Sequence, residues 1–106
     1  MRVPEFSQQG LEKLLSDDSL ALVQFGTDWC APCKRQERVL MEAMAGWGHD
    51  LKIGKVNVED WPDCAAQHGV TRNPTLCLFQ AGEQIGFHEG FLTLGDLENF
   101  VSEYLP

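Results

Sequence analysis

The sequence predicts an α/β fold in which helices flank a central mixed sheet of four or five strands. Apolar runs of strand length alternate with segments of helical periodicity, which implies parallel pairing through right-handed crossovers. The run SLALVQF (19–25) is apolar after its first residue except for Gln24, as is typical of a parallel strand that helices cover on both faces. A hairpin pattern nearer the C-terminus adds antiparallel strands. With 106 residues, the chain is expected to form a single domain over residues 1–106.

The first half of the chain is expected to contain two helices and two strands. Ser7 can cap a short first helix, in which three leucines share the inner face: Leu11, Leu14 and Leu15. The strand described above follows this helix. From Pro32 the apolar residues recur at helical spacing until Gly46 and Gly48, which end a second helix. The segment LKIGKVNV (51–58) predicts the second strand.

The next part of the chain is expected to contain a short helix and a hairpin. Pro62 suits the first turn of the helix PDCAAQH (62–68), and Gly69 marks its end. The segments TLCLFQ (75–80) and QIGFHEG (84–90) flank the turn AGE and predict two antiparallel strands.

A last helix and a weaker strand candidate complete the pattern. Thr93 followed by Asp96 resembles a capping box. The helix that follows has an apolar stripe that runs to the C-terminus: Leu94, Leu97, Phe100, Val101, Tyr104 and Leu105. Residues 2–6 are a candidate for another edge strand, although Pro4 lacks the N–H group that a sheet ladder uses.

Composition and charge argue against several classes of protein. Sixteen acidic residues against eight basic ones give a formal net charge of −8, whereas nucleic-acid binding needs a cationic surface. Apolar residues make up 43% of the chain, but no stretch is long enough to span a bilayer. The start, MRVPEFSQQG, lacks the apolar run and cleavage site of a secretory signal. We therefore expect a cytoplasmic monomer that binds neither nucleic acid nor membrane.

Cys30 and Cys33 occur where a predicted strand is followed by a predicted helix. Unpaired N–H groups and the positive end of the helix dipole favour a thiolate at Cys30. Cys33 lies one turn inside the same helix, close enough to attack a mixed disulfide formed by Cys30, and Pro32 stiffens the loop between them. A close cysteine pair in a reducing compartment is more often catalytic or metal-binding than structural. This arrangement favours dithiol–disulfide exchange.

Zinc binding is the main alternative for these cysteines. The spacing permits a ligand set of Cys30, Cys33, Cys64 and His68. Zinc ligands usually lie on glycine-rich turns, however, whereas here one pair opens a long helix and the other lies on a separate helix, so we expect no metal site. A purely structural disulfide is less expected without an oxidising compartment. Cys64 and Cys77 are expected to be ordinary core residues, with Cys64 partly exposed.

Three motifs resemble the thioredoxin family at the separations that the family shares: WCAPCK (29–34), RNPTLCLF (72–79) and HEGF (88–91). The resemblance covers nearly the whole chain and implies the thioredoxin fold. It also implies a protein-disulfide reductase of electron transport and cell redox homeostasis, in which Cys30 is the nucleophile and Cys33 the resolving thiol. Such a protein acts on protein disulfides, needs no bound cofactor beyond its own redox-active disulfide, and receives electrons from a flavin thioredoxin reductase.

The resemblance implies a substrate groove beside the cysteine pair. Trp29 would shape its rim, and Pro74, in the cis form, would offer a backbone edge to an extended substrate segment. Gly90 would leave room for that segment. Three residues occupy groove positions that are typically small or apolar in the family: Arg72, Asn73 and Glu89. Their polarity predicts a narrower set of clients.

Two further residues are expected to support the chemistry. Gln24 stands where the family holds a buried aspartate, and its amide cannot take up the proton that Cys33 must lose. Lys55 falls in a buried strand, where it either extends to the edge or lies near Gln24. Between the cysteines, Ala31-Pro32 replaces the usual Gly-Pro, which is a mild change.

A function of another class stays open at this point. The same fold could be a binding or adaptor module that holds zinc or a dedicated client without turnover. Stoichiometric zinc in the purified protein, without thiol-dependent turnover of a disulfide substrate, would identify the adaptor. An oxidase or isomerase is less expected, because the Ala-Pro dipeptide lacks the histidine that is common in oxidising relatives.

Overall fold

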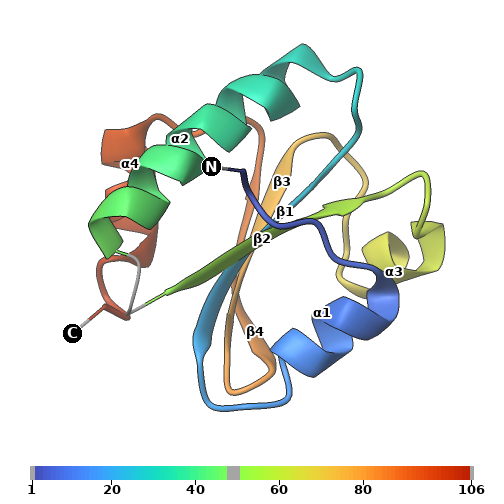
Figure 1. Cartoon of the computed structure of the whole chain (residues 1–106), viewed down its shortest axis with the longest axis horizontal. Coiled ribbons are helices and arrows are strands. Elements are labelled where there is room, and N and C mark those ends of the chain that lie inside the picture. The colour runs from blue at the N-terminus through green and yellow to red at the C-terminus, as the bar shows by residue number, and fades with distance from the viewer. Residues whose placement is uncertain (1, 48–50, 106) are drawn as a thin grey trace.

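A four-stranded mixed sheet lies at the centre of the fold, which the computed structural model describes for residues 2–47 and 51–105 (Figure 1). The strands are β1 (Leu20–Gly26), β2 (Lys52–Asn57), β3 (Thr75–Gln80) and β4 (Glu83–Glu89). Their spatial order is β2-β1-β3-β4. β1 is parallel to β2 and antiparallel to β3, and β3 and β4 form the predicted hairpin. The predicted class of fold, a mixed sheet flanked by helices, is confirmed.

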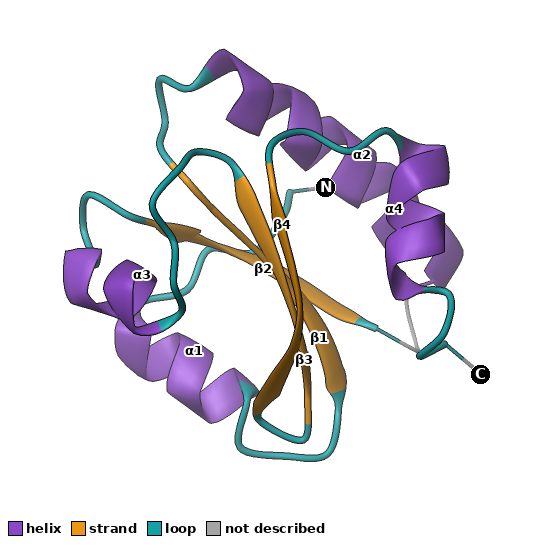
Figure 2. Ribbon diagram, turned by 180° about the vertical axis from the view of Figure 1, so that it is seen from behind, coloured by secondary structure: helices purple, strands orange, loops and turns teal. Residues whose placement is uncertain are grey.

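Two helices cover each face of the sheet. The helices are α1 (Gln8–Leu14), α2 (Ala31–Trp47), α3 (Pro62–Gln67) and α4 (Leu94–Val101). α2 and α4 lie on one face, and α1 and α3 lie on the other (Figure 2). Gly46 is still helical, so it does not end α2 as predicted, and Gly48 lies outside the described residues. Among the described residues, no helix has both the length and the apolar character needed to cross a membrane.

Strand β1 supplies side chains to two separate hydrophobic cores because successive residues point to opposite faces of a sheet. Leu20 and Leu22 belong to the core that includes residues of α2 and α4, whereas Ala21, Val23 and Phe25 belong to the core that includes residues of α1 and α3. All seven residues of the strand are buried. This double burial explains why the segment is apolar at nearly every position.

Side-chain caps define the starts of α1 and α4, as the sequence predicts. The Gly10 N–H group donates to Ser7 Oγ at 3.0 Å, and the Asp96 N–H group donates to Thr93 Oγ1 at 3.2 Å. Both caps satisfy backbone donors that a helix leaves unpaired at its first turn. α4 ends at Val101, however, and the predicted helix does not continue to the C-terminus.

The N-terminal segment differs from its prediction. Residues 2–6 form one isolated bridge, between Glu5 and Lys55, instead of a fifth strand. The Phe6 N–H group donates to the Lys55 carbonyl, and the Lys55 N–H group donates to the Pro4 carbonyl, both at 2.8 Å. Proline can accept such a bond but cannot donate one, so it is compatible with a bridge and unfavourable in a longer ladder.

Candidate active site

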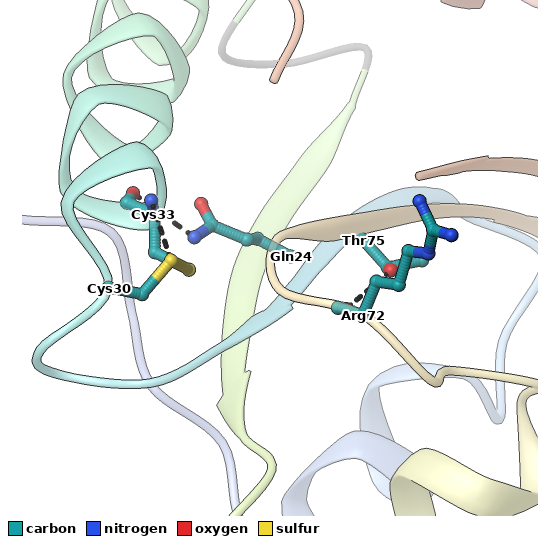
Figure 3. Close-up of a disulfide and its surroundings, with 5 residues drawn as sticks. All are labelled: Gln24, Cys30, Cys33, Arg72 and Thr75. Carbon is teal, nitrogen blue, oxygen red and sulfur yellow. Dashed lines mark hydrogen bonds between the residues drawn. A yellow bond between two sulfur atoms is a disulfide. The ribbon is translucent and has the colours of Figure 1, made fainter. Parts of the chain in front are cut away.

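Cys30 lies directly before α2, in the loop after β1, and Cys33 lies in the first turn of α2 (Figure 3). The two cysteines form a disulfide, and their Cα atoms are 5.1 Å apart. The Cys33 N–H group donates to Cys30 Sγ at 3.2 Å. Cys30 is half-buried, whereas Cys33 is completely buried. A molecule in solution can therefore reach the first sulfur but not the second.

The N-terminus of α2 favours negative charge at Cys30. The helix has 17 residues, and its first turn contains no acidic side chain. Its unpaired N–H groups and the positive end of its dipole therefore act on the cysteine without competition from a carboxylate in that turn. These effects stabilise a thiolate, which is the nucleophilic form of cysteine.

The backbone of Gly26 packs closely against the buried Sγ atom of Cys33. A Cβ atom at this position would lie 2.6 Å from Cys33 Sγ, closer than Cβ atoms approach their neighbours in proteins. The last residue of β1 must therefore lack a side chain if Cys33 is to occupy its position. In the sequence, Gly26 is only a glycine at the end of an apolar run. That position alone does not indicate a contact with Cys33.

Gln24 contacts the turn of α2 that carries Cys33. Its side chain is 1% exposed, and its Nε2 atom donates to the Cys33 carbonyl at 3.1 Å (Figure 3). Its Oε1 atom is buried and has no hydrogen-bond partner among the described residues. A buried acceptor without a partner costs about 1–3 kcal/mol, so a water bound to this atom would be strongly favoured.

Lys55 lies opposite Gln24 in the parallel register of β1 and β2. Its Nζ atom is 2.8 Å from Glu37 Oε1 and 3.9 Å from Glu5 Oε1. Two carboxylates therefore compensate its charge, and Glu37 is a partner that the sequence did not reveal. Gln24, Lys55 and Glu37 all line one small cavity of about 10 Å³. The prediction that Lys55 lies near Gln24 is confirmed.

The residues predicted to form the substrate groove show the expected local features. Trp29 is 76% exposed and directly precedes Cys30. The Asn73–Pro74 peptide bond is cis, and the Pro74 carbonyl accepts a hydrogen bond from the Gly90 N–H group at 2.8 Å. Gly90 has a φ of +96°, and among the described residues, apart from Gly90 and its two chain neighbours, none has an atom within 4 Å of the position that a Cβ would take. Pro74 itself is buried, whereas the space next to Gly90 is open.

Arg72 and Glu89, which were predicted to make the groove polar, pair with each other. Arg72 Nε lies 3.2 Å from Glu89 Oε2, and both residues are exposed. The Arg72 guanidinium points away from the disulfide (Figure 3). Asn73 is exposed as well. The two charges therefore form an exposed ion pair and compensate each other.

Gln36 connects the cysteine-bearing helix to the loop that follows β4. Its Oε1 atom accepts a hydrogen bond from the Leu92 N–H group at 2.7 Å, and its Nε2 atom donates to the Leu92 carbonyl at 3.0 Å. The side chain is completely buried. Both hydrogen bonds hold α2 against the segment that contains Gly90. A polar residue on the inner face of the predicted helix was the available signal.

Cys64 and Cys77 are core residues, as predicted. Both are buried, so the expected partial exposure of Cys64 is wrong. Burial raises the pKa of the Cys77 thiol to about 12, with a smaller contribution from Cys64, and burial and then the charge of Glu12 raise the pKa of Cys64. Both thiols are therefore held in their unreactive protonated form near neutral pH.

The four alternative zinc ligands do not gather at one site, although Cys64 Sγ and His68 Nδ1 lie 4.0 Å apart. Cys30 and Cys33 are bonded to each other, and His68 packs against Phe25 and Phe79 in the core that contains α3. Its Nδ1 atom lies 2.8 Å from the Cys64 carbonyl oxygen. Within residues 2–47 and 51–105, no three His, Cys, Asp or Glu side chains gather as metal ligands would.

Comparisons with known proteins agree with this geometry. The family model described as Thioredoxin matches residues 2–103. A thioredoxin of Chlamydia caviae is 42% identical over 85 residues, which cover 80% of this chain and 82% of the relative. A thioredoxin of Buchnera aphidicola (subsp. Schizaphis graminum) is 31% identical over 103 residues, which cover 96% of this chain and 95% of the relative.

The fold has a close counterpart among solved structures. One comes from work on the thiol resolving mechanism of yeast mitochondrial 1-Cys peroxiredoxin via glutathione/thioredoxin systems. It superposes with a TM-score of 0.85, covers 95% of this chain and 94% of its own, and is 24% identical. At that identity the likeness shows the fold alone. Together with the matching family model and the relatives above, the redox pair shows that the chain belongs to the thioredoxin family and is a thiol–disulfide oxidoreductase.

Proposed function

We propose that the protein reduces disulfides of other proteins by dithiol–disulfide exchange through Cys30 and Cys33. The observation that carries this proposal is the unequal exposure of the two sulfurs at the start of α2. Cys30 is accessible and lies where a thiolate is stabilised, whereas Cys33 is buried one turn behind it. One thiol is therefore suited to attack and the other to resolution.

The proposed reaction has two steps. The Cys30 thiolate attacks a client disulfide, forms a mixed disulfide, and displaces one client sulfur as a thiolate. The Cys33 thiol then loses its proton and attacks Cys30, so that the second client sulfur leaves with the electron pair of the broken bond. The client gains two electrons and the Cys30–Cys33 disulfide closes.

The groove residues would position the client for the first step. We propose that an extended client segment lies along the backbone at Asn73 and Pro74, with Trp29 at its rim. Gly90 supports this placement because its position is open to a neighbouring chain. Main-chain hydrogen bonds of this kind would supply affinity, whereas the polar side chains beside them would restrict which client sequences fit.

The proposal includes an external electron donor but no bound cofactor, because thioredoxins work through their own disulfide. By family resemblance, the donor is a flavin thioredoxin reductase. The yeast work named above links a peroxiredoxin to the thioredoxin system, and oxidised peroxiredoxins are one client class that we propose for this chain. We further propose that the protein acts as a cytoplasmic monomer.

Cys33→Ser is expected to accumulate a stable mixed disulfide with a disulfide-bonded client, because the resolving thiol is gone. Non-reducing electrophoresis and mass spectrometry would identify the adduct and locate it at Cys30. Cys30→Ser is the matched variant and should form no adduct and reduce no client. Reduction by Cys30→Ser at the rate of the parent protein would overturn the assignment of the nucleophile.

Replacing Arg72 with glycine and Glu89 with valine together is expected to raise activity on a generic disulfide substrate. The double change removes an exposed ion pair that an apolar client segment would have to desolvate. Because the two charges compensate each other, the gain should be small, about twofold to fivefold, as expected for an exposed pair worth up to about 1 kcal/mol. The measurement is kcat/KM for reduction of a protein disulfide, and an unchanged or lower value would count against the predicted role of the pair.

A further inference from the structure

Resolution of a mixed disulfide requires Cys33 to lose its thiol proton, and the fold hides this thiol from solvent. Cys33 is 0% exposed, and Gly26 closes its inner side. The side chain that donates a hydrogen bond to the Cys33 carbonyl is the amide of Gln24, and an amide does not accept a proton at neutral pH. Another group must therefore take the proton.

A polar cavity lies beside Gln24 and Gly26. Its volume is about 10 Å³, which is enough for a single water molecule. The position that a Gly26 Cβ would take lies 2.6 Å from Cys33 Sγ and 3.3 Å from Gln24 Nε2, so the sulfur is a close neighbour of the cavity wall. The buried Oε1 atom of Gln24 has no protein partner among the described residues and can accept a hydrogen bond from a water there.

Among the described residues, four that carry a charge line this cavity: Glu5 from the N-terminal segment, Asp28 from the loop after β1, Glu37 from α2 and Lys55 from β2. Asp28 is exposed, and Glu5 is 50% exposed and 3.9 Å from Lys55. Glu37 is held more firmly, with its Oε1 atom 2.8 Å from Lys55 Nζ. Glu37 lines the cavity, and because its side chain is 24% exposed it also reaches solvent.

Glu37 is also suitably placed along α2. It follows Cys33 by four residues, and residues at this separation lie on the same face of a helix. The carboxylate therefore lies one turn beyond the resolving thiol and on its side of the helix. Glu5 and Asp28, the other described carboxylate residues that line the cavity, do not lie on this helix.

We propose that Glu37 accepts the proton of the Cys33 thiol through a water molecule that Gln24 Oε1 holds in the cavity. The thiol gives its proton to the water, and the water gives a proton to the Glu37 carboxylate. The Cys33 thiolate forms the bond to Cys30, and the client sulfur leaves with the electron pair of the broken bond and takes a proton from solvent. Glu37 later releases its proton to solvent. It acts through the water and not on the sulfur directly.

This inference rests on the proposed function and is tested on the resolving step alone. Dithiobis-nitrobenzoate, an aromatic disulfide, reacts with the reduced protein and releases one coloured thiolate when Cys30 attacks and a second when Cys33 resolves. Stopped-flow mixing separates the two releases. The variants are Glu37→Gln, which removes the charge at constant size, Glu37→Asp, which retains a carboxylate, and Glu42→Gln, an exposed control on the same helix.

Glu37→Gln is expected to slow the second release at neutral pH by at least about tenfold, a partial loss of the assistance that a general base gives. The rate of the first release should change little. The slowing of the second release should become smaller in alkaline solution, because hydroxide then takes the Cys33 proton. Glu37→Asp should recover part of the rate of the second release. Glu42→Gln should behave as the parent does. If Glu37 acted only through its charge, Glu37→Gln would speed the second release instead of slowing it. The reason is that removing a negative charge favours a thiolate at the nearby Cys33.

Two results would separate this inference from the function on which it rests. A second release in Glu37→Gln that is as fast as in Glu42→Gln, or faster, would overturn the role of Glu37 while leaving the reductase intact. Absence of the first release in the parent protein would instead overturn the proposed function.

Discussion

Gln36→Leu is expected to lower the free energy of unfolding by about 2–4 kcal/mol, because each buried group left unpaired costs about 1–3 kcal/mol. The leucine side chain has nearly the same size but cannot bond to the N–H and carbonyl groups of Leu92, which Gln36 satisfies in the parent. Some of the loss is offset by the hydrophobic side chain itself. Urea denaturation of the oxidised protein would measure the change.

The same substitution should also weaken client reduction. The loop that contains Leu92 follows directly after Gly90, and loss of both hydrogen bonds frees this loop from α2. We expect a higher KM for a protein disulfide with a smaller change in the attack on a small aromatic disulfide. Gln67→Leu, at an exposed position of α3, is the control for replacing a helical glutamine. Equal urea midpoints for the two variants would contradict the structural role of Gln36.

Gln24→Asp is expected to destabilise the protein at neutral pH by about 3 kcal/mol or more, the usual scale for an uncompensated buried charge. The aspartate also loses the amide donor that now serves the Cys33 carbonyl. Burial would hold its carboxyl pKa above the unfolded value, so the lost stability should return as the pH falls and the group is protonated. Denaturation at neutral pH and in mild acid would measure both effects.

The carboxylate at position 24 should alter the redox chemistry as well. A negative charge near the cysteine pair disfavours a thiolate, so thiolate formation at Cys30 should require a higher pH. The same group can take the proton from Cys33 directly, so the resolving step should be faster. Gln24→Asn is the matched control because it has the length of aspartate without its charge. Identical thiolate titrations and release rates in the two variants would show that residue 24 only fills space.

Local patterns in the sequence were sufficient for most of the architecture. Hydrophobic periodicity identified the helices and strands, and the Ser7 and Thr93 caps depend on residues only three positions away. The cysteine pair and its helix are likewise adjacent in sequence. These features could be predicted because each is decided by near neighbours along the chain.

Contacts between distant segments could not be predicted in the same way. Gln36 and Leu92 are 56 residues apart, and Glu37 and Lys55 are 18 apart, so only the folded chain shows that they meet. Cys64 lies on a helix of six residues, which is too short for periodicity to define its inner face. The unpaired Oε1 atom of Gln24 and the cavity beside it depend on the packing of several elements at once.

Strand β1 lies between two neighbouring strands, and all of its residues are buried. β4, in contrast, is paired on one side only, and the N-terminal segment is attached to the sheet by a single bridge. In native-state fluctuations, segments with few pairings open at low free-energy cost, whereas a central strand opens only when the whole domain unfolds. We therefore expect the amide protons of β1 to exchange with solvent only through global unfolding. Because the loop to Cys30 starts at the end of this strand, partial openings at the sheet edges leave the backbone that supports the cysteines in its native place.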